Sequence, residues 1–156
     1  MNAYSCIHFA CHATQDTTKP LQSGFYLHDG CLELSEIIKE KLIGADFAFL
    51  SACQTSTGNE QLSEEAVHLA GGMLAAGYRG VVATMWSIED RYGPGIAEDF
   101  YKHLTSHGAN VNKGLERLNS DGAAHALHYA IQQVRKTLDN SETSLMTWVP
   151  YVHFGI

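Results

Sequence analysis

Three runs of apolar residues predict buried strands. They span residues 4–11, 46–53 and 80–86. In the second and third runs the apolar residues follow one another directly instead of alternating with polar ones, as is typical of central strands that are covered on both faces. The pattern therefore predicts a sheet whose middle strands are packed between other elements.

Four segments show apolar positions at helical spacing. Ser35 can cap a short helix over residues 36–42, and residues 62–76 repeat apolar side chains at steps of three and four. Another helix follows Pro94, which suits a first helical turn, and a fourth carries apolar residues on one face over 127–138. Strands and helices alternate, which indicates an α/β domain with a largely parallel sheet.

Two further segments complete the order of elements. An Asp29-Gly30 pair stands between two short apolar segments within residues 25–34, and this is a strong hairpin signal. Residues 148–154 read as a last strand, with Pro150 at its start or edge.

The composition narrows the possible classes of protein. The chain has 156 residues, of which 45% are hydrophobic, so we expect a single domain over residues 1–156 with an ordinary core. The formal net charge is −7 and there is no basic run, so nucleic acid is not an expected partner. No apolar stretch approaches the roughly 20 residues that span a bilayer, and the first residues do not read as a signal peptide. We expect a cytoplasmic protein without a membrane partner.

The cysteines are sparse and no secretion signal accompanies them, so we expect free thiols. Cys6, Cys11 and Cys31 form no CxxC pair, and a zinc site is therefore not expected. Neither a metal nor an organic cofactor is implied.

Polar or reactive side chains follow three of the predicted strands. They are Cys11-His12, Ser51-Ala52-Cys53 and Trp86-Ser87-Ile88-Glu89-Asp90. Ligands gather beyond the carboxyl ends of parallel strands, so these groups are expected at one edge of the sheet. A thiol and an imidazole there suit nucleophilic catalysis, because the imidazole can lower the thiol pKa or take its proton. The spacing alone leaves open that Cys53 is an ordinary core residue.

Separated motifs along the chain resemble a known family. They are His8-Phe9-Ala10-Cys11-His12, Leu27-His28-Asp29-Gly30, Leu50-Ser51-Ala52-Cys53-Gln54-Thr55 and Ala76-Gly77-Tyr78-Arg79-Gly80-Val81-Val82-Ala83-Thr84-Met85-Trp86. Together they resemble the CHAT domain family of caspase-like, separase-related cysteine peptidases. The resemblance implies a caspase–hemoglobinase-like sandwich, with a mostly parallel central sheet flanked by helices. It also implies a catalytic dyad, and by motif match its members are His12 and Cys53.

Further site residues come with the resemblance. The backbone N–H groups of Ala13 and Cys53 would bind the oxyanion, although the family usually has glycine where this chain has Ala13. An aspartate after the third strand lines the S1 pocket of separase-like enzymes, so Asp90, with Glu89 secondary, would favour a basic P1 residue. Members of this fold usually carry further strands before the histidine strand, so we expect the N-terminal strands to be missing.

The expected function is that of a cysteine endopeptidase acting on protein or peptide substrates. Family members are often joined to repeat or NTPase regulatory domains, which are the other expected partners. The alternative is a weakly active or inactive binding or scaffold module; Ala13 favours it, and the presence of both His12 and Cys53 opposes it. A thiol-based acyltransferase or amidase would need the same dyad. His8 is expected to be a buried structural histidine on the same strand face as His12.

Overall fold

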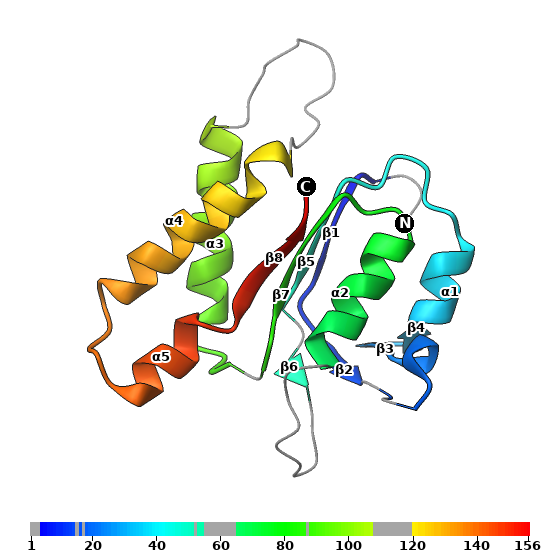
Figure 1. The fold of residues 1–156 in the computed structure, drawn as a ribbon, viewed down its shortest axis with the longest axis horizontal. Coiled ribbons are helices and arrows are strands. Elements are labelled where there is room, and N and C mark those ends of the chain that lie inside the picture. Colours follow the sequence, from blue (N-terminus) through cyan, green and yellow to red (C-terminus); the bar gives the residue numbers. More distant parts are fainter. Residues whose placement is uncertain are drawn as a thin grey trace.

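The largest element of the protein is a four-stranded sheet with helices on both faces (Figure 1). The computed structural model describes residues 4–14, 16, 18–51, 53–54, 65–86, 88–107 and 120–156. The strand order is β1-β5-β7-β8; the first three strands are parallel and β8 is antiparallel to β7. The strands are β1 (Cys6–Phe9), β5 (Phe47–Leu50), β7 (Gly80–Thr84) and β8 (Tyr151–Gly155). The prediction of an α/β domain with a mostly parallel sheet is confirmed.

The helices divide between the two faces of this main sheet. They are α1 (Leu34–Lys39), α2 (Glu65–Ala75), α3 (Gly93–His107), α4 (Ala123–Arg135) and α5 (Glu142–Trp148). Alternate residues of β5 belong to two different cores: Ala48 and Leu50 pack with α1 and α2, whereas Phe47 and Phe49 pack with α3 and α4. All four side chains are at most 2% exposed, which explains why the strand is apolar at every position. Within the described ranges, every helix is too short or too polar to span a lipid bilayer.

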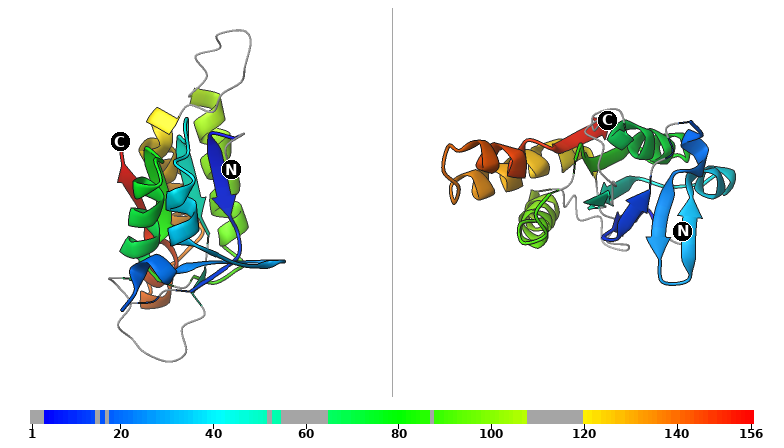
Figure 2. Two further views of the ribbon diagram at one scale, coloured as in Figure 1. Left: turned by 90° about the vertical axis from the view of Figure 1, so that its right-hand side faces the viewer. Right: turned by 90° about the horizontal axis from the view of Figure 1, so that it is seen from below.

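A second, smaller sheet lies at the carboxyl ends of the main-sheet strands. Its order is β4-β3-β2-β6, and Figure 2 shows the β3–β4 hairpin projecting from the body of the protein. The strands are β2 (His12–Thr14), β3 (Gly24–Leu27), β4 (Gly30–Glu33) and β6 (Cys53–Gln54). The hairpin agrees with the Asp-Gly signal.

Two of the predicted strands leave the main sheet before the end of their apolar runs. The run over residues 4–11 ends as a main-sheet strand at Phe9, and the run over 46–53 ends at Leu50. The chain then enters β2 and β6 respectively, because both segments pair with the second sheet. Pairing with a distant hairpin is a non-local interaction that the local pattern does not encode.

Only one face of the small sheet joins the core. Phe25 and Ala13 are 0% and 1% exposed, and the Phe25 ring stacks on Phe9 with centroids 4.1 Å apart. The next register pair, His12 and Tyr26, is exposed on the opposite face. This alternation is the pattern of a sheet with one buried and one open face.

The predicted cap of the first helix is wrong. Helix α1 begins after Glu33, whose backbone N–H donates to the Glu36 carboxylate at 3.3 Å. Ser35 lies inside the first turn, and its hydroxyl donates to Glu33 at 3.2 Å. Glu33 and Glu36 therefore form a capping box, in which a glutamate takes the N-cap position that serine or threonine usually occupies.

The end of the chain also differs from its pattern. Trp148 ends helix α5 and does not open a strand; the last strand begins after Pro150. Helix α5 is capped by Ser141, whose hydroxyl accepts a hydrogen bond from the Ser144 N–H at 3.2 Å. The other helices agree with the periodicity within a few residues at their ends; residues 62–64 of the expected second helix lie outside the described residues.

Candidate active site

The second sheet brings the two predicted catalytic residues onto neighbouring strands. Strands β2 and β6 are parallel, and His12 is the register partner of Cys53. Neighbouring strands lie about 4.8 Å apart, so the two backbones are adjacent at this point. The main sheet contributes to this pairing. Its strands β1 and β5, which precede β2 and β6 in the chain, are also parallel neighbours, with Phe9 opposite Leu50.

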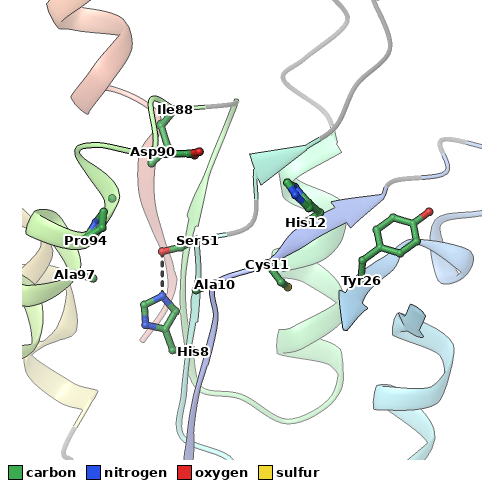
Figure 3. Close-up of a pocket in the computed structure, with 11 residues that line it drawn as sticks. His8, Ala10, Cys11, His12, Tyr26, Ser51, Ile88, Asp90, Pro94 and Ala97 are labelled. Atoms are coloured by element: carbon green, nitrogen blue, oxygen red, sulfur yellow. Dashed lines mark hydrogen bonds between the residues drawn. The ribbon is translucent and has the colours of Figure 1, made fainter. Parts of the chain in front are cut away.

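An open cleft with a volume of about 620 Å³ lies beside this pair of strands (Figure 3). His12 and Tyr26 form one wall, and Ile88, Asp90 and Pro94 form the other. The remaining lining residues are His8, Ala10, Cys11, Ser51, Gly93 and Ala97. The cleft thus opens at the carboxyl ends of the strands, where ligand sites of parallel sheets are expected.

The two predicted substrate-binding carboxylates are separated by the structure. Asp90 lines the cleft, across from His12. Glu89 is not among the lining residues, and its Oε2 accepts from the Arg91 Nε at 2.7 Å. The side chains of these two adjacent residues point in different directions, so Asp90 faces the cleft and Glu89 does not.

The loop that carries Asp90 is anchored to the C-terminal part of the chain. The Met85 N–H donates to the Pro150 carbonyl at 2.8 Å. The Trp86 Nε1–H donates to the Met146 carbonyl at 3.0 Å. These bonds fix the start of the loop and therefore restrict where Asp90 can lie.

His8 belongs to the cleft, and the prediction that it is buried is wrong. The residue is exposed, although its ring centroid lies 4.8 Å from that of Phe49 and 5.7 Å from that of Tyr101. Partial burial of the ring lowers the pKa of His8 below its usual value near 6.5. Its Nε2 shares a hydrogen bond of 3.0 Å with the Ser51 hydroxyl. His8 and His12 line one cleft from two different sheets, and not from one strand face.

Cys6, Cys11 and Cys31, the cysteines whose side chains the structure describes, form no disulfide. Cys6 and Cys11 are partly buried and Cys31 is exposed. Burial raises the pKa of the Cys11 thiol. Burial, followed by the nearby carboxylates of Glu33 and Glu36, raises the pKa of Cys31. Both groups are therefore held in the less reactive, protonated form at neutral pH.

Ala13 carries no left-handed backbone strain. Among the described non-glycine residues, positive φ occurs only at Lys41 (43°). Ala13 is paired with Phe25 on one side and with Gln54 on the other. Backbone N–H groups of a strand lie in the plane of the sheet, so the Ala13 N–H points toward β3 or toward β6.

No group of three or more His, Cys, Asp or Glu side chains could hold a metal ion in the part of the chain that the structure describes. Among the lining residues, Tyr26 has a polar side chain that the sequence patterns did not single out. Ser51 was named together with Cys53 at the end of the second predicted strand, although no role was assigned to it. The place of Tyr26 could not be predicted, because it depends on the pairing of β3 with β2.

One comparison with known proteins identifies the family. The family model of the CHAT domain matches residues 1–156, the whole chain. A search of curated proteins gives no match. The matched region contains both sheets and every residue that lines the cleft. The chain therefore belongs to the CHAT domain family, which is related to the caspase-like cysteine peptidases.

Proposed function

We propose that this chain is a cysteine endopeptidase in which Cys53 is the nucleophile and His12 the general acid and base. The observation that carries the proposal is the parallel pairing of β2 with β6, with His12 and Cys53 as register partners beside an open cleft. A nucleophile and its base must lie within reach of each other, and this register supports that requirement.

The reaction follows from these two groups. The Cys53 thiolate attacks the scissile carbonyl carbon, and the carbonyl electrons move onto oxygen. His12, as an imidazolium, then protonates the leaving amine as the C–N bond breaks, which leaves a thioester on Cys53. Neutral His12 finally takes a proton from water as the water oxygen adds to the thioester carbon. The C–S bond then breaks, which releases the acid product and restores the Cys53 thiolate beside the His12 imidazolium.

The backbone N–H groups of Ala13 and Cys53 are proposed to bind the oxyanion. Preorganised N–H donors stabilise the charge that develops on the carbonyl oxygen, because they need no reorientation during the reaction. The absence of positive φ at Ala13 supports alanine as an acceptable residue here.

Asp90 is proposed as the chief contact of a basic P1 residue. It lines the wall of the cleft across from His12, which supports this role. A carboxylate that binds arginine with two parallel hydrogen bonds is favourable in a partly dehydrated cleft. Glu89, which is paired with Arg91, is at most a secondary contact in this proposal.

The helices on both faces of the main sheet support a caspase–hemoglobinase-like sandwich as the fold type. The proposed partners are a protein or peptide substrate and, elsewhere in a longer assembly, regulatory repeat or NTPase domains. A reducing, cytoplasmic setting is proposed because a thiolate nucleophile has to remain reduced.

Labelling with an electrophilic peptide tests the nucleophile. We expect a peptidyl-arginine acyloxymethyl ketone to modify Cys53 selectively, as read by intact mass and peptide mapping. The Cys53→Ala variant should lose both labelling and peptide cleavage while it keeps its fold. The matched control is Cys31→Ala, which removes an exposed thiol outside the cleft lining. Equal labelling of Cys11 or Cys31 in the folded protein would contradict the proposal.

A positional-scanning peptide library tests the P1 pocket. We expect cleavage after arginine or lysine, and Asp90→Asn should lower kcat/KM for these substrates while the rate of iodoacetamide labelling at Cys53 is unchanged. Glu89→Gln is the matched control. A preference for aliphatic P1 residues would rule out Asp90 as the determinant. Peptide binding without labelling or cleavage would instead identify a binding module.

A further inference from the structure

Four residues form one continuous row across the small sheet. Cys53 is the register partner of His12, His12 that of Tyr26, and Tyr26 that of Cys31. The row crosses the strands in the order β6, β2, β3, β4. We call these four positions the catalytic row. The pairing places Tyr26 next to His12, on the side away from Cys53.

The described side chains of the catalytic row lie on the open face of the sheet. His12, Tyr26 and Cys31 are exposed, whereas Ala13 and Phe25, the next positions on the other face, are buried. The Tyr26 side chain is 49% exposed and belongs to the cleft lining. A half-exposed aromatic ring in a cleft offers a large apolar surface at a small loss of side-chain entropy on binding.

Asp90 and Tyr26 stand on opposite sides of His12. Asp90 follows β7, which pairs with β5, the strand that leads to Cys53. Tyr26 lies on β3, which pairs with β2, the strand that carries His12. Figure 3 shows His12 between the two side chains, along the mouth of the cleft. The strand neighbours therefore place the four positions in the order Asp90, Cys53, His12, Tyr26.

The chemistry of the reaction gives this order a direction. The residue before the scissile bond stays attached to Cys53 as the thioester, whereas the amine of the following residue receives its proton from His12. A substrate chain therefore runs from Asp90, past Cys53 and His12, toward Tyr26. Neighbouring strands are about 4.8 Å apart and an extended peptide advances about 3.3 Å per residue, so Tyr26 lies within reach of the first two residues after the bond.

We propose that Tyr26 determines specificity on the leaving-group side of the cleft, where it selects an apolar or aromatic residue at P1′ or P2′. The inference rests on the proposed peptidase function. It concerns the residues after the scissile bond, which the proposed P1 contact does not select.

Internally quenched peptides with a fixed P1 arginine test the proposal. Phenylalanine, leucine, glycine and aspartate are placed in turn at P1′ and at P2′. We expect the wild-type protein to favour phenylalanine over glycine at one of the two positions by about tenfold in kcat/KM, the scale of an aromatic contact together with its buried area. Tyr26→Ala should reduce this ratio to less than about twofold, while Tyr26→Phe should keep it.

Two controls separate recognition from damage to the fold. Leu27→Ala alters the next residue of the same strand, which is 41% exposed and outside the catalytic row, and should leave the ratio unchanged. The preference for arginine at P1 and the rate of Cys53 labelling should be the same in Tyr26→Ala and in the wild type. A Tyr26→Ala effect on P2 or P3 selectivity would show that the chain runs in the other direction and would overturn the proposal.

The outcomes distinguish this inference from the function on which it rests. An active peptidase whose P1′ and P2′ preferences are the same in Tyr26→Ala retains the proposed function and refutes the role of Tyr26. A protein that cleaves none of the peptides and does not label at Cys53 refutes both.

Discussion

The two sheets of this protein contain similar residues and serve different purposes. In the main sheet Phe47, Phe49 and Val82 are completely buried, because helices cover both faces. In the small sheet only one face is covered, and the other presents His12 and Tyr26 to the cleft. The comparison shows that the candidate catalytic residues lie on the sheet face that no helix covers.

The two ends of the main sheet differ in the same way. At the amino end the buried Asp46 carboxylate accepts from Ser120 at 2.8 Å and pairs with Arg79 at 3.3 Å. At the carboxyl end His12 and Tyr26 border an open cleft. Polar groups that are satisfied within the fold stabilise it, whereas polar groups that face a cleft are available to a ligand.

The largest expected difference between the sheets is in stability. Phe47→Ala removes a fully buried ring that packs on Phe100 with centroids 5.4 Å apart, and should lower the free energy of unfolding by about 3–5 kcal/mol. Tyr26→Ala on the open face should lower it by less than about 0.5 kcal/mol. Urea denaturation followed by circular dichroism measures both. Equal losses would mean that the small sheet is not open as described.

The second difference is in catalysis, between the two histidines of the cleft. His12→Ala should lower kcat/KM by about a hundredfold or more, the usual contribution of a general acid and base, with little change in stability. It should also shift the pH midpoint of Cys53 alkylation upward, because a positive neighbour is lost. Peptide cleavage and timed alkylation provide the measurements.

His8→Ala is the matched variant. It removes the hydrogen bond to Ser51 and should lower the free energy of unfolding by about 1 kcal/mol. If His8→Ala abolished turnover at an unchanged melting temperature while His12→Ala did not, the two roles would be reversed.

A smaller effect is expected from a histidine of the main sheet. The His153 Nε2 is buried without a hydrogen-bond partner among the described residues, and burial lowers the pKa of His153 below 6.5. Below that pH the unfolded chain binds more protons than the folded chain. The stability contributed by neutral His153 is therefore complete above about pH 6.5 and is lost as the pH falls toward the lower folded-state pKa.

Thermal unfolding between pH 5 and pH 8 tests this dependence. His153→Leu should flatten the pH dependence of the melting temperature, whereas His125→Leu, which replaces an exposed histidine of α4, should leave it unchanged. A wild-type melting temperature that rises as the pH falls through this range would contradict the stated direction.

The smallest effect on the reactivity of Cys53 is expected at Ala13. Glycine here should lower the free energy of unfolding by about 0.5–1 kcal/mol, because glycine loses more backbone entropy in a strand. The rate of Cys53 labelling should stay within about twofold of the wild type, since the backbone conformation at this position does not need glycine. A large gain in labelling would show that alanine restrains the oxyanion site.

Much of this fold was accessible from the sequence. The apolar runs over residues 46–53 and 80–86 place two central strands correctly, because burial on both faces requires apolar residues at every position. Helical periodicity located the long helices for a similar reason, and the Asp29-Gly30 turn located the hairpin. The motifs that end in His12 and contain Cys53 identified the family.

The tertiary structure decided the rest. The chain leaves the main sheet after Phe9 and Leu50 because its next residues pair with a hairpin that is distant in sequence, and no local pattern reports such pairing. The same pairing sets the register that joins His12 to Cys53 and Tyr26 to His12. The sequence therefore determined which residues can be buried and which can react, whereas strand register, a non-local property, decided which of them meet.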